Sequence, residues 1–235
     1  MTGLYRLGDR NILIHSIFQH IHQYCTQYQS DGVPDFTVTI TPADIAFERE
    51  RATRNCEDDY LETLAVYRKI AEKMPDYDTV LMHGSAVAVD GEAFLFAAPS
   101  GTGKSTHTRL WREVFGERAV MVNDDKPLVR IAENGATVYG TPWNGKHHLD
   151  SNIAVPLRAI CLLERDQTNH IHEITPQEAL PALVRQTYRP LDPAAMVKTL
   201  TLLDRLKSNT RFYRLGCNME REAAQVAYRG MKGQP

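Results

Sequence analysis

One stretch, residues 94–106, constrains the fold more than any other part of this 235-residue chain. It begins with the apolar run 94–97, passes through a glycine-containing turn and ends in Lys-Ser-Thr at the start of a helical pattern. This order predicts a strand, a loop and a helix, which is the layout of a phosphate-binding P-loop. Residues 98–103, called the glycine loop below, depart from the usual pattern because Ala98 stands where the first glycine is expected.

The predicted loop carries the groups that a nucleoside triphosphate and its Mg²⁺ ion need. Backbone N–H groups of a tight loop and of the first helical turn form a concave set of donors for phosphate oxygens. Lys104 would add positive charge at the β- and γ-phosphates, and the Ser105 hydroxyl would bind Mg²⁺. The residues expected to bind the nucleotide are Pro99, Ser100, Gly101, Thr102, Gly103, Lys104, Ser105 and Thr106. The alternative is a chance glycine-rich turn that caps a helix.

The apolar periodicity on either side of this stretch predicts an α/β fold with a mixed sheet. Strands at 79–89 and 93–98 are expected to pair around the Asp90–Gly91 turn, which rules out a simple doubly wound parallel sheet. Helices are expected at 12–24, 59–74 and 104–115, from a start at 175–178, and near 193–206 and 218–228; further strands are expected at 36–40, 119–122, 128–131, 137–139, 157–163, 170–174 and 211–215. The polar stretch 42–58 is expected to be partly irregular. We expect an N-terminal lobe over residues 1–75 and a catalytic domain over residues 76–235.

The overall composition excludes several classes of partner. Because 27 basic and 29 acidic residues give a net charge of −2, no bulk electrostatic attraction to nucleic acid or to an anionic membrane is expected. The four cysteines lack the paired spacing of a zinc site or a disulfide scaffold. No signal-peptide pattern and no long apolar run occur, so a cytoplasmic protein is expected.

A second group with chemical potential follows the predicted helix 104–115. The apolar strand 119–122 ends in Asn-Asp-Asp, about twenty residues after Ser105, which is room for one helix and one returning strand. The carboxylates of Asp124 and Asp125 are therefore expected beside the strand of the glycine loop. One of them could hold the Mg²⁺ ion, and the other could accept a proton from an attacking hydroxyl. The alternative is a solvated acidic turn.

A histidine upstream completes the set. His83 lies in the strand predicted at 79–89, where pairing with the next strand would bring it to the entrance of the glycine loop. It could orient or polarise an aspartate there. A single histidine in a strand is more often structural, and its functional interpretation depends on the other two elements.

The order of these elements resembles one superfamily. His83-Gly84, then residues 98–106, then Asn-Asp-Asp at 123–125 resemble the HPr kinase/phosphorylase and phosphoenolpyruvate carboxykinase superfamily. The resemblance implies a mixed-sheet P-loop kinase core with flanking helices, ATP and Mg²⁺ as cofactors, and a serine-type hydroxyl as acceptor. It further implies that Asp125 helps Ser105 hold the metal while Asp124, assisted by His83, acts as base with Lys104 on the transferred phosphate. The two aspartates can exchange these roles, because adjacent carboxylates near one cation titrate together.

The residues expected on the substrate side come from two later segments of the chain. Trp143 could form a planar wall of the site, and Lys146 and Arg185 could bind a phosphate or a carboxylate. The alternatives are a packing tryptophan in an ordinary loop and a solvated helix end. The glycine-rich segment with which HPr kinases engage their protein substrate is not recognisable, and neither are the additional ligands of carboxykinases.

Together these features predict a cytoplasmic, ATP- and Mg²⁺-dependent kinase for serine in a small molecule, a peptide or a protein. A nucleotide-binding regulatory module without transfer activity and a carboxykinase-like lyase are the alternatives. The resemblance also permits the reverse reaction with inorganic phosphate. The sequence leaves open whether the protein forms a homo-oligomer.

Overall fold

The computed structural model describes residues 1–145 and 147–233 as a mixed α/β fold with a curled mixed sheet and several helices. The strands are β1 (Thr2–Leu7), β2 (Arg10–His15), β3 (Phe36–Thr39), β4 (Thr79–Leu81), β5 (Ser85–Val89), β6 (Glu92–Ala97), β7 (Ala119–Asn123), β8 (Leu128–Ala132), β9 (Gly135–Tyr139), β10 (Ala154–Arg165), β11 (His170–Ile174) and β12 (Arg211–Cys217). The helices are α1 (His20–Tyr24), α2 (Pro42–Arg51), α3 (Asp58–Lys73), α4 (Lys104–Phe115), α5 (Pro176–Gln186), α6 (Pro193–Asn209) and α7 (Glu222–Lys232).

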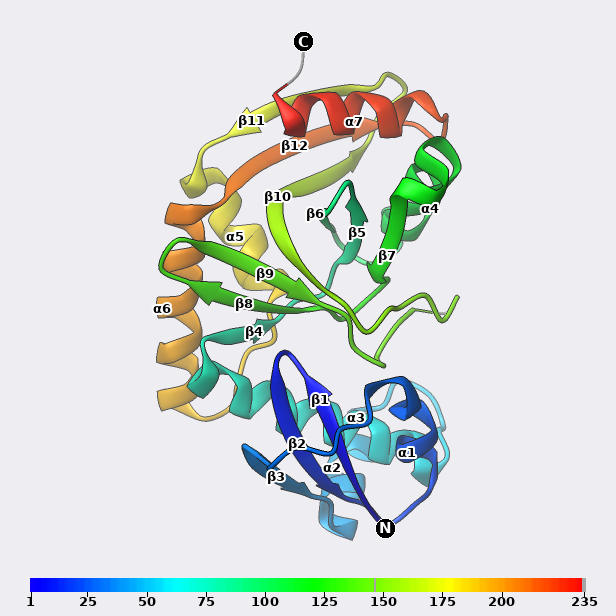
Figure 1. Ribbon diagram of the computed structural model, residues 1–235, viewed down its shortest axis with the longest axis vertical. Coiled ribbons are helices and arrows are strands. Elements are labelled where there is room, and N and C mark those ends of the chain that lie inside the picture. The colour runs from blue at the N-terminus through cyan, green and yellow to red at the C-terminus, as the bar shows by residue number, and fades with distance from the viewer. Residues whose placement is uncertain (146, 234–235) are drawn as a thin grey trace.

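The N-terminal part of the chain differs from the sequence-based expectation. The predicted helix 12–24 is wrong, because β1 and β2 form a hairpin around Gly8–Asp9 and only residues 20–24 are helical. The apolar residues of β2 alternate with period two, so Ile12 and Ile14 are buried together on one face. β3 adds parallel to β2, which completes a three-stranded sheet at one end of the molecule (Figure 1).

The polar segment 42–58 is partly irregular, as expected: residues 52–57 form neither helix nor strand, whereas residues 42–51 form α2. Its start is fixed by a capping box in which Thr41 and Asp44 exchange hydrogen bonds, with Pro42 at the first helical position. Thr41, Pro42 and Asp44 are thus the sequence signal of a helix start in a segment that has few apolar residues.

The large sheet is organised by β10. This twelve-residue strand begins antiparallel to β9 and continues parallel to both β6 and β12, so it joins the two halves of the curled sheet. The strand order is β4-β8-β9-β10-β6-β5-β7, with β12 on β10 and β11 on β12. The Asp90–Gly91 hairpin between β5 and β6 is confirmed.

Two details of the predicted sheet are wrong. The strand expected at 79–89 is broken at residues 83–84, because β4 pairs with β8 whereas β5 pairs with β6 and β7. In addition, β7 is not the neighbour of β6, since β5 lies between them. β7 and β6 are both antiparallel to β5 and therefore run in the same direction. The carboxyl ends of β6 and β7 thus reach the same edge of the sheet.

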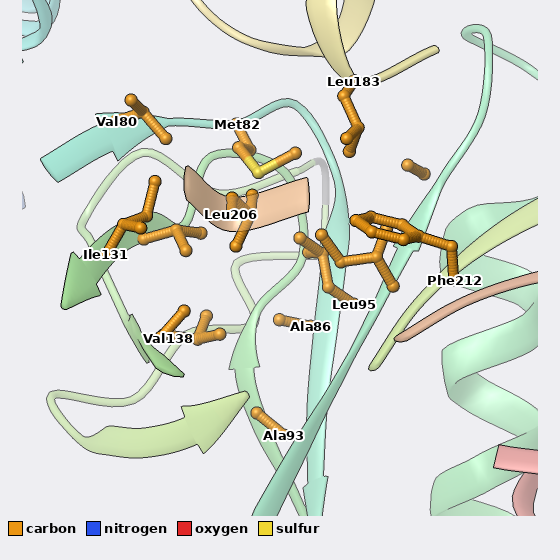
Figure 2. Packing of buried hydrophobic residues seen from close by; sticks show 14 of the residues in the cluster. Val80, Met82, Ala86, Ala93, Leu95, Ile131, Val138, Leu183, Leu206 and Phe212 are labelled. Atoms are coloured by element: carbon orange, nitrogen blue, oxygen red, sulfur yellow. The ribbon is translucent and has the colours of Figure 1, made fainter. Parts of the chain in front are cut away.

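Three hydrophobic clusters pack against the strands and fix their positions. One cluster lies between the curled sheet, α5 and α6, where Leu183 and Leu206 meet the sheet residues Leu95 and Phe212 (Figure 2). A second cluster packs α4 and α7 on the other face of the sheet through Trp111. A third cluster fills the N-terminal lobe and also includes Leu81, Leu128, Tyr139 and Trp143 from the rest of the chain. Apolar packing therefore crosses residue 75, and the division of the chain at that point stays a prediction.

Candidate functional site

The glycine loop joins the buried strand β6 to the start of α4, in the order predicted from the sequence. Gly101 and Gly103 have φ values of 78° and 123°, a range that residues with a Cβ rarely adopt. Helix α4 begins directly at Lys104, so the N–H groups of its first turn have no partners within the helix. Loop and helix together present a set of donors at the sheet edge that also receives β7.

Lys104 is folded over this loop. Its side chain is 8% exposed, and its Nζ donates a hydrogen bond to the Ala98 carbonyl at 2.9 Å. Burial lowers the pKa of the Lys104 ammonium, and the nearby charge of Asp125 opposes this shift only in part. A phosphate oxygen bound beside the ammonium would add the negative charge that such a buried cation lacks.

Asp124 is the most deeply buried carboxylate of the site, at 3% exposure. Its Oδ1 accepts a hydrogen bond from the Ser85 hydroxyl at 3.0 Å, and that hydroxyl also contacts Thr108. Its Oδ2 is buried without a hydrogen-bond partner among the residues that the structure describes. A Cβ built on Gly145 would lie 2.9 Å from Oδ2, so only a glycine leaves this oxygen free on that side. A buried carboxylate oxygen with no partner is suited to binding a cation.

Asp125 faces a different neighbour. Its Oδ1 lies 3.3 Å from His83 Nε2, while His83 Nδ1 lies 2.8 Å from Gln186 Oε1. The His83 backbone N–H also donates to the Gln186 carbonyl. Burial would raise the pKa of the Asp125 carboxyl, but the hydrogen bond from His83 and the positive charges of Lys126 and Lys104 outweigh it and lower the pKa. The expected contact of His83 with Asp124 is therefore corrected, because His83 pairs with Asp125.

The side chain of Asn123 fixes the turn that orients Asp124 and Asp125 in different directions. Its Oδ1 accepts hydrogen bonds from the backbone N–H groups of Asp125 and Lys126, at 2.8 and 2.6 Å. Its amide donates to the Thr141 carbonyl, which anchors the side chain in the interior. The chain therefore turns directly after β7, with Asp124 pointing inward and Asp125 pointing toward His83.

These groups meet in one cavity of about 750 Å³. The cavity is lined by residues of the glycine loop and by His83, Lys104, Ser105, Thr106, Asp124 and Asp125. Arg109 and Arg112 of α4 also line it and add positive charge that the sequence did not single out. Of the residues expected to bind nucleotide, Ser100, Gly101, Gly103, Lys104, Ser105 and Thr106 thus share this cavity with both carboxylates.

The donor set fits Mg²⁺ held together with phosphate oxygens. In the described part of the chain, no three His, Cys, Asp or Glu side chains are placed to hold a metal by themselves. Mg²⁺ in nucleotide sites is commonly bound by one or two carboxylates together with substrate phosphates and water. The unpartnered Asp124 oxygen and the Ser105 hydroxyl in the same cavity are ligands of this kind.

The three residues expected on the substrate side have different outcomes. Trp143 is 6% exposed, donates through Nε1 to the Thr63 carbonyl and packs on Tyr67, so it does not line the cavity and the expected wall is corrected. Arg185 lies at the end of α5 and lines a neighbouring cavity. Lys146 lies outside the described residues.

Two partners in the site were missed by sequence reasoning. Gln186, which contacts His83, is 103 residues away in the chain and carries no local signal. Ser85 stands two residues after His83 and hydrogen-bonds Asp124. The only local hint of its position was that residues on one face of a strand recur at every second position.

Comparisons with known proteins match this chain to one family model and to solved structures. The family model described as SynChlorMet cassette protein ScmC matches residues 53–190, more than half of the chain. No curated protein sequence matches it. Among solved structures, the Hpr(Ser) kinase/phosphatase from Coxiella burnetii is similar with 11% sequence identity and a TM-score of 0.32. That alignment covers 63% of this chain and 93% of the other, and a likeness this weak carries no argument. Across residues 1–145 and 147–233, no helix combines the length and apolar character needed to cross a membrane.

Proposed function

The chain belongs to the ScmC family of SynChlorMet cassette proteins, and we propose that it is a phosphotransferase. In this proposal the protein transfers the γ-phosphate of ATP, bound with Mg²⁺, to a serine-type hydroxyl of a small molecule, a peptide or a protein. The proposal goes beyond the family description, which states no activity.

One observation carries the proposal. A single cavity gathers backbone donors at a helix start, a buried lysine, a hydroxyl, a buried carboxylate oxygen that has no partner among the described residues, and a second carboxylate beside a histidine. The backbone donors and the lysine suit phosphate binding, and the hydroxyl and the first carboxylate suit metal binding. The second carboxylate, with its histidine, suits activation of a hydroxyl. A module that only bound nucleotide would have no use for the His83–Asp125 pair.

The contacts suggest a division of roles between the aspartates that is opposite to the one the resemblance implied. Asp124 and Ser105 would hold Mg²⁺, which when bound neutralises charge on the phosphates. Asp125, held by His83, would accept the proton of the attacking hydroxyl. The hydroxyl oxygen then forms a bond to the γ-phosphorus, and the bond from that phosphorus to the β–γ bridging oxygen breaks, so that ADP leaves. The Lys104 ammonium would stabilise the negative charge that develops on the leaving oxygen.

Incubation with γ-labelled ATP and a panel of serine-containing acceptors tests the proposal. Free serine, serine-containing peptides and small serine-bearing proteins would be compared with and without Mg²⁺, and label on the acceptor would be measured by mass spectrometry. Lys104→Ala is expected to lose both nucleotide binding and transfer, whereas Lys207→Ala, on α6 away from the cavity, serves as the matched control. Tight ATP binding without any labelled acceptor would instead identify a regulatory module, and consumption of oxaloacetate would identify a lyase.

A further inference from the structure

A second cavity, of about 620 Å³, lies against the first part of the glycine loop. It shares Ser100 and Gly101 with the larger cavity but also reaches Ala98, where the loop leaves β6. A third cavity, of about 520 Å³, shares Gly101 and Thr102 with the second but extends to Thr106 and His107. The second cavity therefore reaches toward the start of the glycine loop, and the third reaches toward the first turn of α4.

The position of Lys104 indicates which end receives the acceptor. In a loop of this type the lysine reaches the β- and γ-phosphates, while the helix start binds the phosphates nearer the nucleoside. Lys104 Nζ lies 2.9 Å from the carbonyl oxygen of Ala98, so the ammonium is at the end of the loop that borders the second cavity. The transferred phosphate would lie at that end, and the third cavity would be left for the nucleoside.

The second cavity is lined by three arginines, of which two are already engaged. Arg214 forms an ion pair with Glu164. Arg165 donates hydrogen bonds to the carbonyls of Gly101 and Thr102 in the glycine loop. Arg185, which is exposed, forms no ion pair and no side-chain hydrogen bond within the described part of the chain.

The acidic residues of the wall do not neutralise Arg185. Glu164 is paired with Arg214, and Glu178 closes the capping box of α5 by accepting hydrogen bonds from Thr175. One guanidinium therefore remains available, beside an apolar floor that includes Leu162 and Ala182. The two carboxylates in the wall would repel a polyanion, so the cavity suits a ligand with a single negative group.

Arg185 is connected to the proposed base, Asp125, through Gln186 and His83. Gln186 follows Arg185 and lines the same cavity, and it hydrogen-bonds His83 through both its side chain and its carbonyl. His83 in turn contacts Asp125. A ligand held by Arg185 would thus be fixed relative to the group that accepts the hydroxyl proton.

We propose that this second cavity binds the phosphate acceptor and that Arg185 binds a carboxylate carried by the acceptor close to its hydroxyl. The inference rests on the proposed phosphotransferase function. A carboxylate matches the planar guanidinium through two parallel hydrogen bonds. The acceptor is then a hydroxy acid, or a peptide with an acidic group near its serine, and neutral hydroxyl compounds are poor substrates.

Matched acceptors test this proposal. Blocked serine peptides would carry either aspartate or asparagine one, two or three residues from the serine, and free serine would be compared with serinamide. With the wild-type protein, the best acidic member of a pair is expected to exceed its amide partner roughly tenfold or more in kcat/KM, mainly through KM. Arg185→Gln should remove this preference, and Arg185→Glu should turn it toward peptides with lysine at the same position. Arg189→Ala, an exposed arginine outside the cavity, is the matched control.

The outcomes separate this inference from the proposed function. Unchanged binding of an ATP analogue and unchanged phosphorylation of neutral peptides by Arg185→Gln, together with the lost preference, support it. An acidic preference that persists in Arg185→Gln overturns it, although the kinase assignment then stands. An equal fall in kcat for acidic and neutral acceptors also overturns it, because Arg185 would then act on the transferred phosphate. If the wild-type protein labels no acceptor at all, both proposals fail.

Discussion

Replacing each aspartate of the site separately with asparagine distinguishes metal binding from proton transfer. In Asp124→Asn the amide oxygen can still accept the hydrogen bond from Ser85, but the buried negative charge is lost. In Asp125→Asn the carboxylate that faces His83 is lost, at a place where the His83 and Asp125 side chains are 29% and 31% exposed. The first variant should therefore lose the metal, and the second should keep it.

The structure sets the magnitudes. Among the described residues Asp124 Oδ2 has no hydrogen-bond partner, and the amide nitrogen of an asparagine at this place would be an equally unpartnered donor, so Asp124→Asn should change the stability of the ligand-free protein by no more than about 1 kcal/mol. For a chain of this length that is a change in Tm of at most roughly 2–4 °C. In wild-type protein, a Mg²⁺–nucleotide complex at about 100 times its Kd adds roughly 2.7 kcal/mol of stability. Asp124→Asn should lose most of the Mg²⁺-dependent part of that gain, while Asp125→Asn should keep it and lose roughly 10²–10⁴-fold in kcat.

Thermal unfolding with EDTA, with a non-hydrolysable ATP analogue, and with the analogue plus Mg²⁺ measures these effects, and label transfer measures kcat. Asp31→Asn, which replaces an exposed aspartate in the loop before β3, controls for the loss of one charge. The reasoning is refuted if Asp125→Asn abolishes the Mg²⁺-dependent rise in Tm while Asp124→Asn retains it. The roles of the two aspartates would then be those that the superfamily resemblance implied.

Three further predictions concern neighbouring residues. His83→Gln removes the hydrogen bond that lowers the pKa of Asp125, so burial should raise this pKa and the acid limb of the kcat/KM profile should move to higher pH; an unmoved limb would exclude Asp125 as the base. Arg165→Gln frees two carbonyls of the glycine loop and should weaken nucleotide binding roughly 3–10-fold by calorimetry, with Arg165→Lys intermediate; unchanged nucleotide binding would exclude this role of Arg165. Trp143→Phe should cost about 1 kcal/mol in denaturant unfolding through its lost bond to Thr63 without changing kcat, and a fall in kcat would restore Trp143 to the site.

The local parts of the fold were predictable because short-range chemistry determines them. Asp90–Gly91 specifies a hairpin, and the observed turn has positive φ at both residues. The glycine loop and α4 were likewise readable from apolar periodicity and glycine placement. The coarse α/β class with a mixed sheet followed from these elements and is confirmed.

The errors arose where pairing over long distances decides the structure. Apolar runs flank His83, Gly84 and Ser85 on both sides, so the local pattern does not indicate that the chain leaves one sheet neighbour and joins another there. The segment 12–24 satisfies both a two-residue and a 3.6-residue period in part, and pairing of its first residues with β1 selects the strand. Such choices depend on partners that the local sequence does not contain.

The roles of Asp124 and Asp125 likewise depend on contacts that the sequence around them does not reveal. Adjacent carboxylates have no sequence property that distinguishes them, and their like charges would couple if both faced one space. Asn123 removes this ambiguity, because its side chain binds the N–H groups that follow β7 and so turns Asp125 away from Asp124. One carboxylate is then desolvated next to Ser85, and the other is oriented by His83. The site thereby obtains two different chemical groups from two identical side chains, and the residue that separates them is the asparagine before them.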